Sequence, residues 1–98
     1  MDFLQTLPPK LRAKSLRDID LLEEFGYDLR EPHVKPIQGI YELRVKFASD
    51  IARIFYFAFV NDTFVLLHGF KKKTMRTPQR EIDIALKRKE DYVRRIEK

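Results

Sequence analysis

The sequence contains no cysteine, so the chain can form no disulfide bond, no thiolate metal site and no cysteine nucleophile. It also lacks a long hydrophobic run, because the longest apolar stretch, 54–60, is far too short to cross a bilayer. The N-terminal segment has neither the basic region nor the apolar region of a secretory signal peptide. We therefore expect a cytoplasmic protein that does not contact a membrane.

The length and the charge of the chain predict one small basic domain. The chain has 98 residues, of which 44% are hydrophobic, and this predicts a single domain, 1–98, with one modest core. Lys and Arg number 20 against 15 acidic residues, for a formal net charge of +5. Such a balance favours a polyanionic partner such as nucleic acid, or an acidic protein. A well-solvated surface explains the same excess charge without any partner.

Two amphipathic helices are predicted, one in each half of the chain. The prolines at 8–9 suit the first turn of a helix whose apolar residues recur at helical spacing until Gly26. The Thr-Pro pair at 77–78 suits the N-cap and first turn of a second helix with its own apolar stripe. Between them, the two prolines of 27–38 predict a loop.

The charges of the first helix are ordered against its dipole. Basic residues occupy its first half and acidic residues its second half, whereas the helix macrodipole favours the reverse order. A local rule that is broken in this way can mark a binding surface. The basic residues are Lys10, Arg12, Lys14 and Arg17, and the acidic residues are Asp18, Asp20, Glu23 and Glu24.

Three strands are predicted between the helices. Apolar and polar residues alternate over 39–47, which is typical of a half-buried strand. The segment 51–60 is apolar on both faces apart from one arginine, and 63–70 forms the third strand. Tight turns at 48–49 and 61–62 join the three strands into an antiparallel sheet. The order of helix, three strands and helix predicts a small α+β domain.

The turns also predict which residues lie opposite each other in the sheet. If Ala48 and Ser49 form the first turn, Arg44 lies opposite Arg53. If 61–62 is a two-residue hairpin, the opposed pairs are Val60 with Thr63, Phe57 with Leu66, Phe55 with His68, and Arg53 with Phe70. The lysines at 71–73 follow directly after the last of these pairs.

This register predicts a row of Arg44, Arg53 and Phe70 across the three strands. Two like charges directly opposite each other destabilise a sheet, unless an anion lies between them. A bound anionic ligand meets this requirement. Pairing of Arg53 with Glu42, with Asp50 or with carboxylates of the C-terminal helix meets it equally well without a ligand.

An ordered set of short motifs runs through nearly the whole chain. The motifs are YDLREP at 27–32, YELR at 41–44, RIFYF at 53–57, LLHGFKKK at 66–73, TP at 77–78 and EI at 81–82, followed by Ala85, Arg88, Asp91 and Tyr92. In this order they resemble the RelE/ParE toxin superfamily, and more narrowly its HigB-like, phage-derived branch. The resemblance implies a small curved antiparallel sheet of at least three strands with helices packed on one face. Members usually begin with a further strand that has no counterpart here, so we expect its neighbour in the sheet to be an exposed edge.

The same resemblance implies a toxin of a type II toxin–antitoxin system. Such a toxin enters the ribosomal A site and cleaves mRNA there, as an mRNA interferase. The implied partners are the ribosome, mRNA and a cognate antitoxin, which in this branch is usually a helix-turn-helix protein. Two other functions stay open: a ParE-like toxin that binds gyrase, and a basic RNA-binding module without catalytic activity.

Metal-free cleavage of RNA drives a 2′-OH onto the adjacent phosphorus, and it needs a base, an acid and cations on the phosphate oxygens. The resemblance implies that Arg44, Arg53 and one of the lysines at 71–73 supply the cations. We expect Arg53 to bind the scissile phosphate, because an arginine fork suits phosphate oxygens. Lys71 or Lys72 is expected to stabilise the developing charge.

Three further residues are candidates for proton transfer. Glu42 and His68 are acid–base candidates by residue type, and Tyr92 resembles a tyrosine near the C-terminus that some relatives use. Each has a structural alternative: a salt bridge for Glu42, a hydrogen-bonded core position for His68 and packing for Tyr92. His33 and His68 have no metal-ligand spacing with each other or with a carboxylate cluster, so we expect no metal and no cofactor.

The remaining basic residues are expected to act at longer range. Their general attraction to ribosomal RNA should weaken with added salt. These RNA-binding candidates are Lys46, Lys73, Arg76, Lys10, Arg12, Lys14, Arg17, Lys87 and Arg88.

Overall fold

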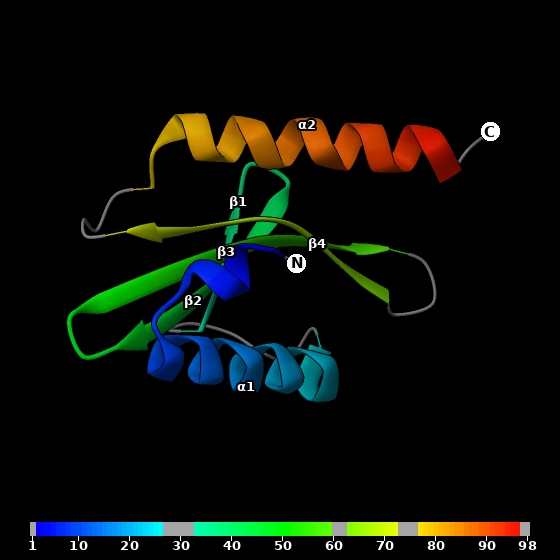
Figure 1. Ribbon diagram of the computed structural model, residues 1–98. Coiled ribbons are helices and arrows are strands. Elements are labelled where there is room, and N and C mark those ends of the chain that lie inside the picture. Colours follow the sequence, from blue (N-terminus) through cyan, green and yellow to red (C-terminus); the bar gives the residue numbers. More distant parts are fainter. Residues whose placement is uncertain (1, 27–32, 60–62, 73–76, 97–98) are drawn as a thin grey trace.

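The computed structural model describes residues 2–26, 33–59, 63–72 and 77–96, which form one sheet between two helices (Figure 1). The four strands pair antiparallel, in the order β1-β2-β3-β4. The expected α+β class and antiparallel sheet are confirmed, and β1 is an additional strand. In chain order the elements are the 3-10 helix η1 (Asp2–Thr6), α1 (Pro9–Phe25), β1 (Val34–Ile37), β2 (Ile40–Phe47), β3 (Asp50–Phe59), β4 (Thr63–Lys72) and α2 (Gln79–Ile96).

The two helices cover opposite faces of the sheet, α1 below it and α2 above it in Figure 1. One apolar cluster joins Leu22 of α1 to Ile54 of β3. The other cluster joins Ile82 of α2 to Phe55 of β3. The expectation that the helices share one face is therefore wrong, and the reason lies in β3. Every residue from 52 to 57 is buried, so both faces of this strand need cover.

The strand β1 lies in the segment 27–38, which its prolines predict to be a loop. It pairs with β2 along its whole length. Pro36 cannot donate to a ladder, and it is tolerated because β1 is at the edge of the sheet. A tight turn with positive φ at Gln38 (48°) and Gly39 (88°) joins β1 to β2. The loop prediction is thus wrong for β1, whereas 27–32 lies outside the described residues.

The predicted row of residues across the sheet is confirmed. Arg44 lies opposite Arg53, as a turn at 48–49 requires. Arg53 in turn lies opposite Phe70. Phe70 packs against the apolar cluster under α2, so the row crosses β2, β3 and β4 on the face that α2 covers.

In the half of the β3–β4 hairpin next to its turn, the pairing register is shifted by one residue from the predicted one. Phe55 pairs with His68, as predicted. The next residue, Tyr56, pairs with Leu66, so Leu67 is the extra residue of a β-bulge. The predicted opposition of Phe57 to Leu66 and of Val60 to Thr63 is therefore wrong, since the pairs are Phe57 with Val65 and Phe59 with Thr63. The hairpin turn itself lies outside the described residues.

The helix α1 begins and ends close to the predicted residues. Gly26 ends it with a φ of 53°, and its backbone N–H is hydrogen-bonded to the last turn. Arg12, near the start, is used for local structure. Its guanidinium caps η1 by donating hydrogen bonds to the carbonyl oxygens of Leu4, Gln5 and Leu7.

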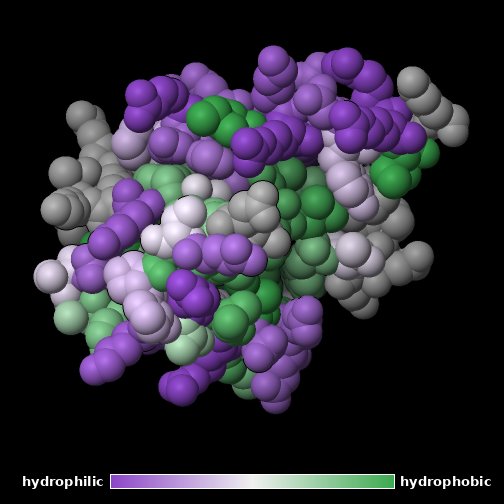
Figure 2. Space-filling model, in the orientation of Figure 1, coloured by the Kyte–Doolittle hydropathy of each residue, from purple (hydrophilic) through white to green (hydrophobic). Residues whose placement is uncertain are grey.

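The helix α2 begins at Gln79, two residues after the predicted cap. The backbone oxygen of Pro78 accepts the first hydrogen bonds of the helix. The hydroxyl of Thr77 does not cap this helix, because it donates to the carboxylate of Glu42. The outward surface of α2 is largely hydrophilic (Figure 2). Neither of the helices in the described part of the chain is long and apolar enough to cross a bilayer.

Among the three glycines, Gly69 of β4 is the one at which an added methyl group meets a neighbour too close to fit. A Cβ atom at this residue would lie 2.3 Å from Cδ2 of Phe3 in η1. We expect Gly69→Ala to displace η1 and to lower the free energy of unfolding by about 1–3 kcal/mol, measured by urea denaturation. Phe3→Ala removes the obstacle, so Gly69→Ala should cost far less in that background. Strictly additive losses in the double variant would contradict this explanation.

Candidate functional site

Arg44 and Arg53 lie side by side but differ in their access to solvent. The side chain of Arg53 is 3% exposed, whereas that of Arg44 is 30% exposed. Both residues point to the α2 side, because the alternate residues of β2 and β3 form the core on the α1 side. The row therefore combines one buried guanidinium with one accessible guanidinium.

The carboxylate of Glu42 lies between the two arginines, and its side chain is 1% exposed. Its Oε1 accepts a hydrogen bond from Arg44 Nε at 3.2 Å and another from Arg53 Nη1 at 2.5 Å. Its Oε2 accepts a hydrogen bond from the hydroxyl of Thr77 at 2.7 Å. The anion that the arginine row requires is thus internal to the protein. Pairing of Arg53 with Glu42, one of the alternatives left open by the sequence, is confirmed.

The environment of Glu42 keeps its carboxyl group ionised. Burial by itself would raise the pKa of Glu42, but hydrogen bonds from Thr77 and Arg44 and the charge of Arg53 outweigh it, so that the pKa is lowered from 4.5. A buried, ionised carboxylate that holds three donors orients the arginines and does not exchange protons near neutral pH. The carboxylate offsets one of the two guanidinium charges, and the row keeps one net positive charge.

Strand alternation places Lys71 away from the arginine row. Lys71 lies opposite Ala52, which belongs to the core under α1, whereas Arg53 faces α2. The ammonium group of Lys71 lies 3.3 Å from Oδ1 of Asp50. The structure therefore does not bring Lys71 together with Arg53. Lys72 is the last residue of β4, and Lys73 and Arg76 lie outside the described residues.

His68 is held by two side chains of α2. Its Nε2 lies 2.6 Å from Oε2 of Glu81, and its Nδ1 lies 3.2 Å from Nη1 of Arg88. A guanidinium group can only donate, so Nδ1 accepts and Nε2 carries the hydrogen that is donated to Glu81. The imidazole also stacks against Phe55 and Phe70. These contacts define one neutral tautomer, in which Nδ1 is the proton acceptor.

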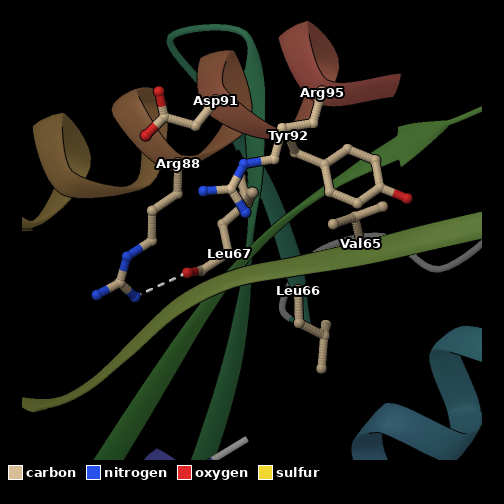
Figure 3. A pocket seen from close by; sticks show the side chains of 7 residues that line it. All are labelled: Val65, Leu66, Leu67, Arg88, Asp91, Tyr92 and Arg95. Carbon is tan, nitrogen blue, oxygen red and sulfur yellow. Dashed lines mark hydrogen bonds between the residues drawn. The ribbon is translucent and has the colours of Figure 1, made fainter. Parts of the chain in front are cut away.

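Tyr92 lines a pocket of about 280 Å³ between α2 and β4 (Figure 3). Its ring packs edge-to-face against Phe57, with the ring centroids 5.8 Å apart. Phe57 is about 13 Å along β3 from Arg53 at the usual rise of a strand, so Tyr92 is not brought into the arginine row. In the same pocket Arg88 donates a hydrogen bond to the carbonyl oxygen of Leu67 at 2.9 Å.

The remaining basic candidates are divided between the two sides of the sheet. Lys46 is exposed on β2 and shares the face of Arg44, and Lys87 is exposed on α2. The other side carries the basic residues of α1, which apart from Arg12 are Lys10, Lys14 and Arg17. In the described ranges, no three His, Asp or Glu residues come together in a group that could hold a metal ion.

Thr77 and Glu81 are the residues of these networks that sequence reasoning missed. From the sequence, Thr77 is assigned only to the start of the second helix, and Glu81 is named only as part of a motif. Their partners are 35 residues away for Thr77 and 13 residues away for Glu81. No local spacing signals contacts of this kind, because they depend on where α2 crosses the sheet.

Thr77→Val removes one hydrogen bond from the ionised carboxylate of Glu42. Because the pKa of Glu42 is lowered in the folded protein, the stability it contributes is present above about pH 4.5 and is lost as the pH falls further. We expect the variant to lose about 1.5–3 kcal/mol of unfolding free energy at pH 7. The loss should be smaller at pH 3 than at pH 7, because acid progressively protonates Glu42 in both proteins. Urea denaturation at both pH values measures this, with Thr63→Val, at an exposed strand position, as the control.

Comparison with known proteins agrees with the motifs and the fold. No curated protein matches the sequence. A family profile described as phage-derived protein Gp49-like (DUF891) matches residues 2–90, which is nearly the whole chain. That family falls within the RelE/HigB-like toxin superfamily and is consistent with a toxin of a toxin–antitoxin system. The chain therefore belongs to the phage-derived Gp49-like protein family.

Proposed function

We propose that the protein is the toxin of a type II toxin–antitoxin system and acts in the cytoplasm as a ribosome-dependent endoribonuclease on mRNA. Membership of the Gp49-like family supports the toxin part of this proposal. The observation that carries the nuclease part is the arginine row. An accessible Arg44 is held beside a buried Arg53 by the ionised carboxylate of Glu42.

In this proposal Arg44 contacts the scissile phosphate. Its guanidinium reaches solvent, and a planar fork of donors matches two non-bridging phosphate oxygens. Arg53, which is expected from the sequence to bind the scissile phosphate, is almost entirely buried and hydrogen-bonded to Glu42. Its role is to add positive potential beneath Arg44, where low solvent access strengthens the field. Glu42 is a positioning residue and takes no proton.

His68 supplies the general base in this proposal. The bond to Glu81 holds the hydrogen on Nε2, so Nδ1 is available to accept a proton once an RNA chain displaces Arg88. Nδ1 takes the proton of the ribose 2′-OH, and the 2′-oxygen forms a bond to the adjacent phosphorus. The bond from phosphorus to the 5′-oxygen then breaks, and the leaving oxygen takes up a proton from a water molecule, and the protonated His68 can then replace that proton. The products are a 2′,3′-cyclic phosphate and a 5′-hydroxyl end.

The cation for the developing charge is assigned to Lys72. Lys71 points to the α1 side and is paired with Asp50. Lys72, which pairs with Ile51 at the end of β4, is the other of the two lysines expected to take this role. Tyr92 has a packing role, because it lies against Phe57. Lys46 and Lys87, both exposed, add general attraction to ribosomal RNA.

A basic RNA-binding module without catalytic activity is the second candidate function. The observation that favours it is that both arginines already hydrogen-bond to Glu42. A stable row of this kind can bind a phosphate backbone without promoting its cleavage. Under either function we expect a cognate antitoxin, for which a helix-turn-helix protein is the expected class.

Replacement of Arg44 tests the nuclease. We expect Arg44→Ala to reduce cleavage about 100-fold or more, because it removes a donor to the phosphate in the transition state. It should also lower the unfolding free energy by about 1.5–3 kcal/mol, because it removes a hydrogen bond to the buried carboxylate of Glu42, so urea denaturation is used to confirm that the variant is folded. Cleavage is measured by mapping mRNA 5′ ends in a translating extract. The control is Arg94→Ala, which removes an exposed arginine paired with Glu90 in the last turn of α2.

The same experiment separates the alternatives. Codon-positioned 5′ ends that disappear in Arg44→Ala and persist in Arg94→Ala support the nuclease. RNA binding without new 5′ ends supports the non-catalytic module. Inhibition of DNA supercoiling by gyrase, without cleavage, supports a ParE-like toxin. Normal cleavage by Arg44→Ala would overturn the role given to that residue.

A further inference from the structure

An apolar groove lies on the α1 side of the sheet, where the β2–β3 turn approaches the start of α1 (Figure 1). Its volume is about 380 Å³. Phe47, the last residue of β2, contributes an aromatic ring and is 39% exposed. The residues that line the groove are Pro8, Pro9, Lys10, Leu11, Phe47 and Asp50. The half-exposed ring of Phe47 thus lies beside two prolines and a leucine in one apolar hollow.

A stripe of positive charge runs along α1 from this groove. Lys10, Lys14 and Arg17 recur at the spacing that places them on one side of a helix. Lys14 is paired with Asp18 at 3.5 Å. Within the described part of the chain, Lys10 and Arg17 have no carboxylate within ion-pair distance.

For Lys10 and Arg17, the described structure shows no role that explains their place in the first half of α1. Basic residues in the first half of a helix oppose its macrodipole. Arg12 has a structural purpose, because it caps η1, and Lys14 has a partner within the helix. Lys10 and Arg17 have neither, and Lys10 is itself a wall of the groove. An anionic partner that docks at the groove would supply the missing counter-charge.

We propose that this groove binds an acidic amphipathic segment of a partner protein. One large apolar side chain of the segment sits against Phe47, and neighbouring carboxylates face Lys10 and Arg17. The volume lies within the usual range for pockets that hold compact apolar groups, about 300–1,000 Å³. Apolar contact supplies the affinity and the charges supply the selectivity, which is a common division at protein interfaces.

A peptide fits the groove better than RNA does. The carboxylate of Asp50, which is paired with Lys71, forms part of the wall and can accept a hydrogen bond from a peptide N–H. The groove also lies on the opposite side of the sheet from Arg44, so one RNA strand cannot use both at close range. If the proposed toxin function holds, the partner is the antitoxin. That identification rests on the proposed function, whereas binding of an acidic segment does not.

The chain contains no tryptophan, so the tryptophan fluorescence of an added peptide can be followed without a tryptophan signal from the protein. The probe is a short synthetic peptide in which one tryptophan is flanked by glutamates, and its fluorescence is followed on titration with the full protein. The matched peptide carries lysines in place of the glutamates. We expect the glutamate peptide to bind about tenfold or more tightly than the lysine peptide. We expect Phe47→Ser to weaken binding of the glutamate peptide by a similar factor.

Two protein variants complete the test. Leu16→Ser removes another exposed apolar residue of α1, 48% exposed and outside the groove, and it should bind the peptide as the parent protein does. Replacing both Lys10 and Arg17 by Glu should reverse the preference, so that the lysine peptide binds more tightly. Thermal unfolding of each variant confirms that it is folded.

Several results would overturn the proposal. Equal binding of the two peptides, or no binding of either, would show that the groove does not bind an acidic segment. Displacement of the peptide by oligouridine from the parent protein assigns the groove to RNA. Binding that survives Phe47→Ser places the peptide elsewhere. The assay contains no ribosome and no mRNA, so a protein that fails to cleave mRNA leaves these outcomes unchanged.

Discussion

The pairing of one buried carboxylate with two arginines is the interaction on which the candidate site depends. Arg44 and Arg53 lie directly opposite each other in the sheet, where like charges are normally destabilising. Glu42 accepts a hydrogen bond from each of them and removes this conflict. Its second oxygen holds Thr77, which lies just before α2. The same group therefore sets the positions of the arginines and helps to set the start of the helix that covers them.

This arrangement stabilises the fold only because its hydrogen bonds are nearly complete. Transfer of a carboxylate and a guanidinium from water into the interior is costly, and their attraction offsets the cost only with good geometry. Glu42 has donors on both oxygens, and the balance of these effects lowers its pKa. The charges of Arg44, Arg53 and Glu42 sum to one positive charge. A positively charged site held by several hydrogen bonds suits the phosphate-binding role proposed for it.

The sheet is covered on both faces, and this divides the functional surface in two. Residues of β3 are buried on either side, so α1 and α2 are both required. Strand alternation then sends Arg53 towards α2 and Lys71 towards α1. The side under α2 carries the arginine row proposed to contact RNA. The side under α1 carries the groove at Phe47 and the basic stripe proposed to contact a partner protein.

The sequence by itself determined the central sheet and the row on it. Alternation over 39–47 assigned Arg44 and Glu42 to one face, and the tight turn at 48–49 placed Arg44 opposite Arg53. Both are local properties, because the side-chain period of a strand and the length of a turn are set within a few residues. The ordered motifs likewise indicated the superfamily, and the Gly26 stop ended α1 where the structure ends it.

Only the tertiary structure decided the rest. The edge strand β1 forms despite Pro36 because β2 offers it a partner on one side only. The bulge at Leu67 and the placement of the helices on opposite faces depend on how the whole sheet packs. The bonds from Thr77 to Glu42 and from Glu81 to His68 join segments that are distant in the chain. Such contacts follow from the path of α2 over the sheet, and no pattern within either segment specifies that path.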